Sequence, residues 1–185
     1  MAGADLRLFV AAYPPVATAR AALAAIGRLD LAPHRPTPLE QIHLTLCFIG
    51  DTPARDLDAV RESVERSAAG LPAFTLTPRR LITLPHRGRP RLVALETDTQ
   101  PTLLELVRRL AKRLARRVRK EPTDCFLPHL TLCRFTHSAD PRPLDEPVDL
   151  PAFTIERIAL MRSVLLPAGA EHRTVMQTPL GPPNQ

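Results

Sequence analysis

Polar and apolar residues alternate along several short stretches of the chain, which is the pattern of β-strands with one buried face. In residues 6–12, Leu8 and Val10 share one face of the expected strand. Phe9 and Ala11 share the other face. Similar patterns, or short continuous apolar runs, predict further strands at residues 42–49, 74–84, 91–96, 126–135, 153–165 and 173–178.

Apolar residues spaced three or four positions apart predict helices at residues 16–29, 53–69 and 102–119. The third helix has the clearest apolar stripe, which consists of Leu103, Val107, Leu110, Leu114 and Val118. Thr102 and Glu105 have the spacing of a capping box at its start. Gly70 is placed to end the second helix.

Proline-rich stretches at residues 32–38 and 136–151 are expected to be loops, and residues 180–185 a frayed end. Strands and helices are mixed without strict alternation of strand and helix. This order predicts an α+β fold rather than a doubly wound parallel sheet.

The composition fits a single domain spanning residues 1–185, because 44% of the residues are apolar and can form a core. No apolar run approaches the roughly 18 residues of a membrane span. Residues 1–5 carry no secretory signal pattern, so a cytoplasmic protein is expected. The three cysteines, Cys47, Cys125 and Cys133, are an odd number and are expected to be reduced.

The charge of +6 and the sequence pI of about 10.2 allow a polyanionic partner. Only Lys112 and Lys120 are lysines, and the chain has 21 prolines, a bias typical of a GC-rich genome. The charge alone is therefore weak evidence for nucleic acid. The arginines of the third helix and of residues 86–91 are explained either as solvated surface or as an RNA track with salt-dependent affinity.

The pentapeptide His-Leu-Thr-Leu-Cys occurs twice, at residues 43–47 and 129–133. On a strand, His43 and Thr45 point to one face while the leucines between and after them point to the other. The same holds for His129 and Thr131. If two lobes face each other, two imidazoles and two hydroxyls converge on one space.

This set of groups suits the hydrolysis of a cyclic phosphodiester. One imidazole takes a proton from water and the other protonates the departing sugar oxygen, roles that histidine fills near neutral pH. The threonine hydroxyls are donors for the phosphate oxygens. A zinc site is disfavoured, because His43 and Cys47 would lie about 13 Å apart along a strand.

The paired motifs and their flanks resemble the RNA 2′,3′-cyclic phosphodiesterases, also called 2′-5′ RNA ligases, of the two-histidine phosphoesterase superfamily. The resemblance rests on residues 7–11, 40–46, 48–50, 90–93, 128–132, Arg134, 158–160, Ser163 and Gly169. It implies a bilobal α+β fold with two antiparallel sheets around a central cleft, flanking helices and pseudo-twofold symmetry. Each lobe would contribute one His-x-Thr strand.

The resemblance also implies roles for single residues. His43 would be the general acid and His129 the general base, while Thr45, Thr131 and Arg134 would bind phosphate. The implied product is a 2′-phosphate, with weak reverse 2′-5′ ligation and no metal or cofactor. The sequence departs from the family pattern at Pro36 and Thr37, where an aromatic residue is common, and at His172, where a tyrosine is common.

For several side chains the sequence leaves two interpretations open. Phe9 and Phe48 either stack a base or pack in the core. Strict alternation turns Arg134 away from His129, whereas a bulge or its long side chain would return it to the histidine face. Alternation places Cys47 and Cys133 on the histidine face, where small filler residues are expected. His172 either lines the cleft or is a polar strand residue, and His34, His86 and His137 are expected in exposed loops.

The expected partner is an RNA or nucleotide end that bears a 2′,3′-cyclic phosphate. No membrane and no obligate protein partner are expected, and the chain is expected to be a monomer. Two alternatives remain open: an RNA-end-binding module with little turnover, and the same chemistry on a 2′-5′ oligonucleotide or an ADP-ribose cyclic phosphate.

Overall fold

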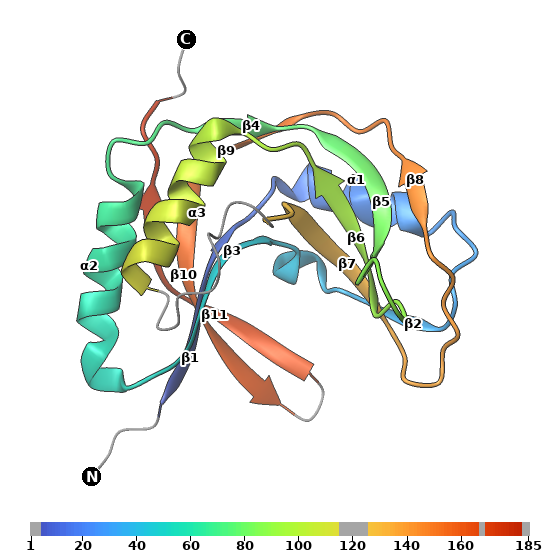
Figure 1. The fold of residues 1–185 in the computed structure, drawn as a ribbon, viewed down its shortest axis with the longest axis horizontal. Helices are drawn as coiled ribbons and strands as arrows, with labels where there is room; N and C mark the ends of the chain where they lie inside the picture. The colour runs from blue at the N-terminus through green and yellow to red at the C-terminus, as the bar shows by residue number, and fades with distance from the viewer. Residues whose placement is uncertain (1–4, 115–125, 167–168, 183–185) are drawn as a thin grey trace.

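The computed structural model describes residues 5–114, 126–166 and 169–182, and Figure 1 shows their arrangement. The described helices are α1 (Val16–Ile26), α2 (Leu57–Ala68) and α3 (Pro101–Leu114), with short 3₁₀ turns η1 (Leu39–Gln41) and η2 (Ala54–Asp56). The strands are β1 (Leu6–Ala12), β2 (His34–Pro36), β3 (Leu44–Thr52), β4 (Phe74–Leu76), β5 (Pro78–Leu84), β6 (Leu92–Thr97), β7 (His129–Phe135), β8 (Asp145–Pro147), β9 (Phe153–Ile155), β10 (Arg157–Leu166) and β11 (Gly169–Pro179).

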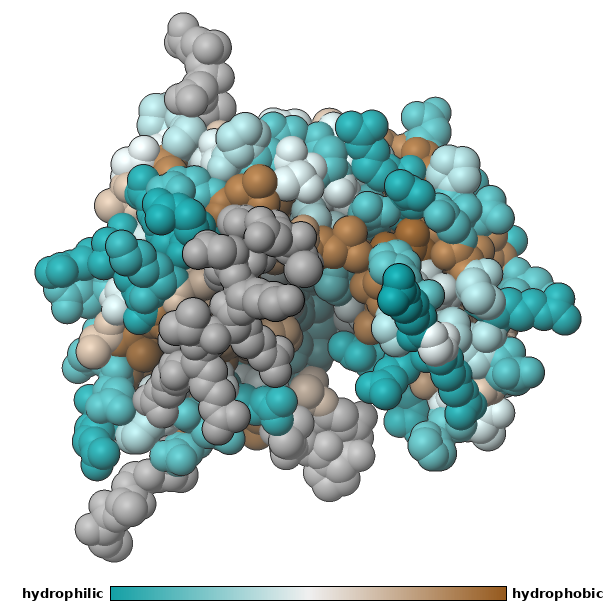
Figure 2. All heavy atoms as spheres, viewed as in Figure 1, coloured by the Kyte–Doolittle hydropathy of each residue, from teal (hydrophilic) through white to brown (hydrophobic). Residues whose placement is uncertain are grey.

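The main sheet has the strand order β11-β10-β1-β3-β7-β6-β5-β8, with β2 paired to β7. Its strands pair in antiparallel fashion, and β4 and β9 form a second, two-stranded antiparallel sheet. Strands β11, β10, β1 and β3 form one half of the main sheet, and β7, β6, β5 and β8 form the other. In the described residues, the two halves meet at a single register pair, Leu44 with Leu130. The halves diverge on either side of this pair, and Figure 2 shows the surface hollowed between them.

The three helices lie on the outer face of the sheet, where the main core is. Helices α2 and α3 pack against the half that contains β3, β10 and β11, while α1 packs against β7 (Figure 1). The predicted stripe of α3 is buried from Leu103 to Leu114 within this core. The inner face of the sheet carries a separate small buried cluster of Phe9, Ala11, Ala159 and Met161.

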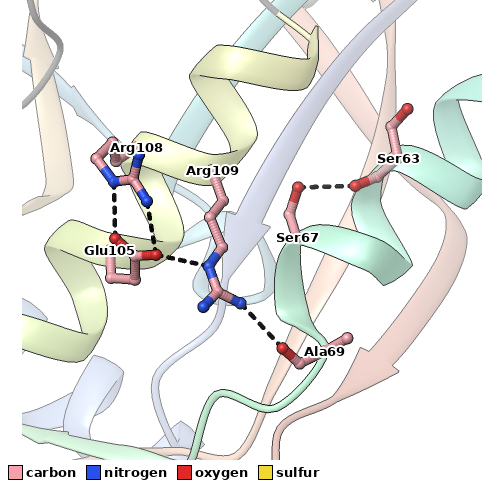
Figure 3. A network of polar contacts seen from close by, with 6 residues as sticks. All are labelled: Ser63, Ser67, Ala69, Glu105, Arg108 and Arg109. Carbon is pink, nitrogen blue, oxygen red and sulfur yellow. Dashed lines mark hydrogen bonds and ion pairs between the residues drawn. The ribbon is translucent and has the colours of Figure 1, made fainter.

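Polar contacts fasten α3 to the end of α2 (Figure 3). Arg109 Nη1 donates to the carbonyl of Ala69 at 2.9 Å, while its Nε donates to Glu105. Hydrogen bonds from Arg108 and Arg109 lower the pKa of Glu105 to about 2. The predicted capping box is therefore wrong: α3 begins at Pro101, so Thr102 lies inside the first turn, and Glu105 pairs with arginines.

Element boundaries differ from the predictions where pairing or turn geometry overrides the apolar pattern. Residues 74–84 divide into β4 and β5, which belong to different sheets. Strand β3 continues to Thr52, because its pairing with β1 resumes at Gly50 after a register shift at Ile49. Gly50 has a φ of 84°, which glycine adopts without strain. Gly70, with a φ of 71°, follows the end of α2 as predicted. The part of the third predicted helix beyond Leu114 lies outside the described residues.

Three predicted irregular stretches contain ordered pairing. Residues 34–36 and 145–147, expected to be loop, form β2 and β8 at sheet edges. The expected fraying after residue 179 is wrong for the first residues: the amide of Leu180 donates to Glu156 and that of Gly181 to Leu71. Short edge pairings such as these carry no apolar periodicity, so the sequence pattern does not show them.

None of the helices in the described part of the chain is both long and apolar enough to cross a lipid bilayer.

Candidate active site

His43 and His129 flank the pair that joins the two halves of the sheet. Leu44 and Leu130 are 1% and 0% exposed, so their side chains are anchored in the outer core. Side chains alternate along a strand, and the histidine before each leucine therefore points to the inner face. Thr45 and Thr131 follow the same leucines by one residue and point to the inner face as well.

The two imidazoles are held in the same way. His43 Nδ1 is 2.7 Å from the carbonyl oxygen of Gln41, and His129 Nδ1 is 2.8 Å from that of Leu127. A carbonyl oxygen only accepts, so Nδ1 carries the proton in each ring. This leaves Nε2 of each ring as the atom that gains or loses a proton. The repeated pentapeptide therefore has the same local geometry in both places, with Nδ1 of its histidine bonded to the carbonyl two residues earlier.

Burial lowers the pKa of His43 to about 4 from its ordinary 6.5. The charges of His172, His129 and Arg134 act in the same direction, and the hydrogen bond to Gln41 opposes them. His43 is therefore neutral at pH 7 while the site holds no anion. The electrostatic influence of His129 and Arg134 on His43 is consistent with their lying near its ring.

A β-bulge brings Arg134 to that space. Ala94 pairs with Thr131, but Val93 pairs with Cys133, so Leu132 is an extra residue in β7. Alternation restarts after the bulge, so that Cys133 is completely buried and Arg134 is on the inner face with the histidines. Of the two interpretations that the sequence left open for Arg134, the register of β7 with β6 therefore favours the one with a bulge.

A β-bulge also follows His43 and Thr45 in β3. Ala11 pairs with Thr45 and Val10 with Cys47, so Leu46 is the extra residue in β3. Cys47 then packs against the outer core, and Phe48 takes the place in β3 that Arg134 takes in β7.

Both cysteines thus leave the histidine face, contrary to the prediction from alternation. Cys133 is fully buried, and Cys47 contacts the main core. Burial raises the pKa of Cys47 to about 11 and also raises that of Cys133. Protonated thiols are poor nucleophiles, so these residues act as packing groups.

An aromatic cluster surrounds His43. The ring centroid of His43 is 5.2 Å from Phe9, 5.2 Å from His172 and 5.6 Å from Tyr13. His172 meets Phe9 edge-on at 4.9 Å. Of the two interpretations of His172, the one that places it at the cleft agrees with these contacts. Tyr13 was not among the predicted site residues. It comes directly after β1 and two residues after Ala11, so the alternation of β1 already pointed to its side.

The two candidate stacking residues differ in exposure. Phe9 is 4% exposed and packs beneath His43 and His172, which leaves little of its ring for a ligand. Phe48 is 75% exposed and lies 6.2 Å from Phe9 between ring centroids. Of the two, Phe48 offers the accessible platform.

A row of charged side chains continues from His129 across the second half of the sheet. Glu96 is the register partner of His129, and Arg80 is the register partner of Glu96. Directly opposed residues share a face of the sheet. Arg80 Nε lies 2.9 Å from Glu96 and its Nη1 lies 3.1 Å from Asp145, so Arg80 is paired with two carboxylates and its charge is compensated.

Two hollows lie on this side of the molecule. One, of about 530 Å³, is lined by Tyr13 and His172, the two side chains that contact His43 together with Phe9. The other, of about 680 Å³, has a basic lining that includes Arg87, Arg89, Arg91, Arg134 and His137. Arg89 is held in place by donating to the carbonyls of His137 and Ala139. Among residues 5–114, 126–166 and 169–182, no group of three or more metal-binding side chains is assembled.

A profile of the 2′-5′ RNA ligase superfamily matches residues 13–165, which include both histidine motifs and Arg134. The chain belongs to the 2′-5′ RNA ligase superfamily. The predicted family is therefore confirmed by a match that spans most of the chain.

Single relatives agree with this assignment. A protein of Thermotoga maritima named RNA 2′,3′-cyclic phosphodiesterase is 25% identical over 141 residues, which are 75% of each chain. The crystal structure of TT0787 of Thermus thermophilus is similar with a TM-score of 0.79 and 27% identity, covering 95% of this chain and 98% of that chain. Escherichia coli LigT, crystallised with 3′-AMP, has a TM-score of 0.77 and 22% identity, with 96% and 99% covered. These similarities confirm the predicted fold class.

Proposed function

We propose that this superfamily member hydrolyses 2′,3′-cyclic phosphates at RNA ends to 2′-phosphates by metal-independent acid–base catalysis. Residues 1–185 would act as a single catalytic domain in which each half of the main sheet supplies one His-x-Thr strand. The observation that supports this most strongly is the pair of imidazoles beside Leu44 and Leu130, each with Nδ1 bound to a carbonyl and Nε2 left for chemistry.

In the proposed reaction, Nε2 of His129 takes a proton from water as the water oxygen attacks phosphorus. The bond between phosphorus and the 3′ oxygen breaks, and Nε2 of His43 delivers a proton to that oxygen. The products are a free 3′-hydroxyl and a 2′-phosphate. Thr45, Thr131 and Arg134 donate to the non-bridging oxygens, where charge develops in the transition state.

The acid role of His43 depends on the substrate. With a pKa of about 4 in the empty site, His43 carries no proton to donate at pH 7. An anionic phosphate next to the ring favours the charged imidazolium and raises this pKa. The anion also offsets the charge of Arg134, one of the groups that lowers it. Substrate binding would thus protonate the acid at the moment it is needed.

RNA, rather than a free nucleotide, is the proposed physiological substrate. The basic hollow beside Arg134 places Arg87 and Arg91 where the phosphates of a nucleic acid strand can bind. The exposed ring of Phe48 would stack a base near the reacting end. If a 5′-hydroxyl of a second RNA replaces the attacking water, the same bond exchange joins the two ends through a 2′-5′ linkage.

The test is product analysis with purified protein in EDTA. Short RNAs ending in a 2′,3′-cyclic phosphate should give only the 2′-phosphate end, separated from the 3′ isomer by chromatography. A panel with 2′-5′ oligonucleotides and ADP-ribose cyclic phosphate compares the alternative substrates. Loss of activity in EDTA would contradict metal independence. Tight binding of RNA ends without product would contradict the enzyme and favour the end-binding alternative.

A further inference from the structure

Glu96 lies directly opposite His129 in the pairing of β6 with β7. The amide of Thr97 donates to the carbonyl of Pro128 at 3.0 Å, so the next pair along the ladder is a hydrogen-bonded one. Hydrogen-bonded and non-hydrogen-bonded pairs alternate in an antiparallel ladder, and side chains approach more closely in the second kind. Glu96 and His129 therefore form a non-hydrogen-bonded pair on the inner face, with Cβ atoms about 4.5–5.5 Å apart.

Arg80 holds the carboxylate of Glu96 in place from the next strand. Its Nε lies 2.9 Å from Glu96, and its Nη1 donates to both carboxylate oxygens of Asp145 at 3.1 Å. One guanidinium is thus shared between two carboxylates, which leaves one negative charge in excess. The Glu96 side chain is only 20% exposed, against 65% for Asp145, so its charge is screened less by solvent. Glu96 therefore presents a fixed, partly desolvated negative charge to its other neighbour, His129.

The carboxylate of Glu96 does not set the tautomer of His129. Nδ1 of that ring already donates to the carbonyl of Leu127 at 2.8 Å, and this bond leaves Nε2 for chemistry. Glu96 can instead act on the charge of the ring. When Nε2 takes a proton, the imidazole becomes a cation, and a negative charge a few ångströms away stabilises that cation.

Positive groups lie around His129 on the other strands and on its own. Arg134 is on the inner face of β7, and its register partner on β2 is Arg35. The charge of His129 lowers the pKa of His43, so the two imidazoles sense each other. In the proposed substrate complex His43 is itself a cation. All of these groups oppose a positive charge on His129, and a carboxylate on β6 offsets them.

We propose that Glu96 is a positioning residue for His129: its carboxylate, anchored by Arg80, stabilises the imidazolium that forms when Nε2 takes a proton from the attacking water. The inference rests on the proposed function for the role of His129 as the base. The proton passes from water to Nε2 while the water oxygen forms its bond to phosphorus. Glu96 stays ionised throughout and receives no proton.

Glu96→Gln removes the charge and keeps the size of the side chain. For a nucleoside 2′,3′-cyclic phosphate, kcat should fall about three- to tenfold, since a base weakened tenfold transfers part of that factor to the rate. KM should change little, because the cation exists only once proton transfer has begun. The acidic limb of the profile of kcat/KM against pH, where the base becomes protonated, should move to lower pH.

Two further variants separate charge from structure. Glu96→Asp keeps the carboxylate and should restore most of the lost rate. Glu146→Gln is the matched control: it removes the same charge from β8, where Glu146 is exposed and opposite Leu81, a residue of the outer core. Its rate and pH profile should equal those of the wild type.

Arg80→Gln should give the opposite shift to Glu96→Gln. Without the guanidinium, the charge of Glu96 is no longer compensated, so the acidic limb should move to higher pH. If the ion pair serves only to stabilise the sheet, both variants would lower the melting temperature and leave the limb in place. That result would overturn the proposal.

An NMR titration of the His129 imidazole in the free protein needs no turnover. The pH midpoint of its resonance should fall in Glu96→Gln, rise in Arg80→Gln and stay unchanged in Glu146→Gln. An unchanged midpoint in Glu96→Gln would overturn the proposal, even in a protein that hydrolyses cyclic phosphates. Displaced midpoints in a protein that hydrolyses none would support the link between Glu96 and His129 and would reject the proposed function instead.

Discussion

Leu44 of β3 and Leu130 of β7 face each other across the seam between the two halves of the main sheet, and both are almost completely buried. Because the catalytic candidates precede these leucines by one residue, the seam fixes the separation of the two imidazoles. The outer core and the inner site are thus coupled through a single register pair. Substitutions at the seam should affect catalysis beyond their effect on stability.

Leu130→Ala tests this coupling. The change should lower the free energy of unfolding by about 2–5 kcal/mol, since it leaves a cavity under β7. At a temperature where the variant is fully folded, kcat should still fall at least tenfold, because the rings are no longer held at the seam. Leu76→Ala, at a fully buried position in the separate β4–β9 sheet, is the control. Equal kcat values for the two variants would contradict the coupling.

Arg134→Gln should reduce kcat by about 10²-fold, the loss typical of one donor that stabilises transition-state charge. Arg134→Lys should recover only part of this, because an ammonium group cannot bind phosphate in the two-pronged manner of a guanidinium. The exposed Arg79, on β5, provides the control substitution Arg79→Gln. A fully active Arg134→Lys enzyme would show that only a charge is required.

The same variant has a second expected effect. Arg134 lowers the pKa of both His43 and His172 in the native protein. Removing its charge should therefore raise both values, which an NMR titration of the imidazole resonances measures. Unchanged titration curves would mean that Arg134 points away from the site.

The depressed pKa of His43 predicts a pH-dependent stability. The unfolded chain binds a proton near pH 6.5, whereas folded His43 does so only near pH 4. Stability is therefore present above pH 6.5 and is lost as the pH falls from 6.5 to 4. The loss at pH 4.5 should be on the order of 2 kcal/mol in urea unfolding. His43→Gln should flatten this dependence, while the exposed His137→Gln should leave it unchanged.

The basic hollow predicts a salt-sensitive preference for RNA. Arg87→Ala with Arg91→Ala should raise KM for an oligonucleotide several-fold and reduce the slope of log affinity against log salt by roughly 1.4. KM for a mononucleoside cyclic phosphate should not change. The paired arginines of α2, in Arg61→Ala with Arg66→Ala, give a control of equal charge. Equal losses for both substrates would contradict an RNA track in this hollow.

The fold class and the histidine pair could be predicted because they depend on short-range alternation. Only Leu44 separates His43 from Thr45, and over that distance a strand is regular. The bulges at Leu46 and Leu132 come directly afterwards, and they reverse the prediction for the cysteines and decide between the two interpretations of Arg134. Alternation assigns every residue to one face in turn, so an extra residue in a strand does not appear in the pattern.

The aromatic cluster around His43 shows a second limit of prediction from the sequence. His172 lies 129 residues from His43 in the chain, yet their ring centroids are 5.2 Å apart. The contact depends on β11 pairing with β10, and β10 with β1. No pattern local to His172 encodes that order of strands. Long-range sheet topology thus decides which polar strand residues reach the site.

The central claim is that His43 and His129 act as one unit on one phosphate, and a double-mutant cycle tests it most directly. The value of kcat/KM for a nucleoside 2′,3′-cyclic phosphate would be measured in EDTA for His43→Ala, His129→Ala and the double variant. Each single change should cost about 10²–10⁴-fold, and the double variant should be no slower than the slower single one. Full activity in either single variant, or losses that multiply in the double variant, would contradict the account.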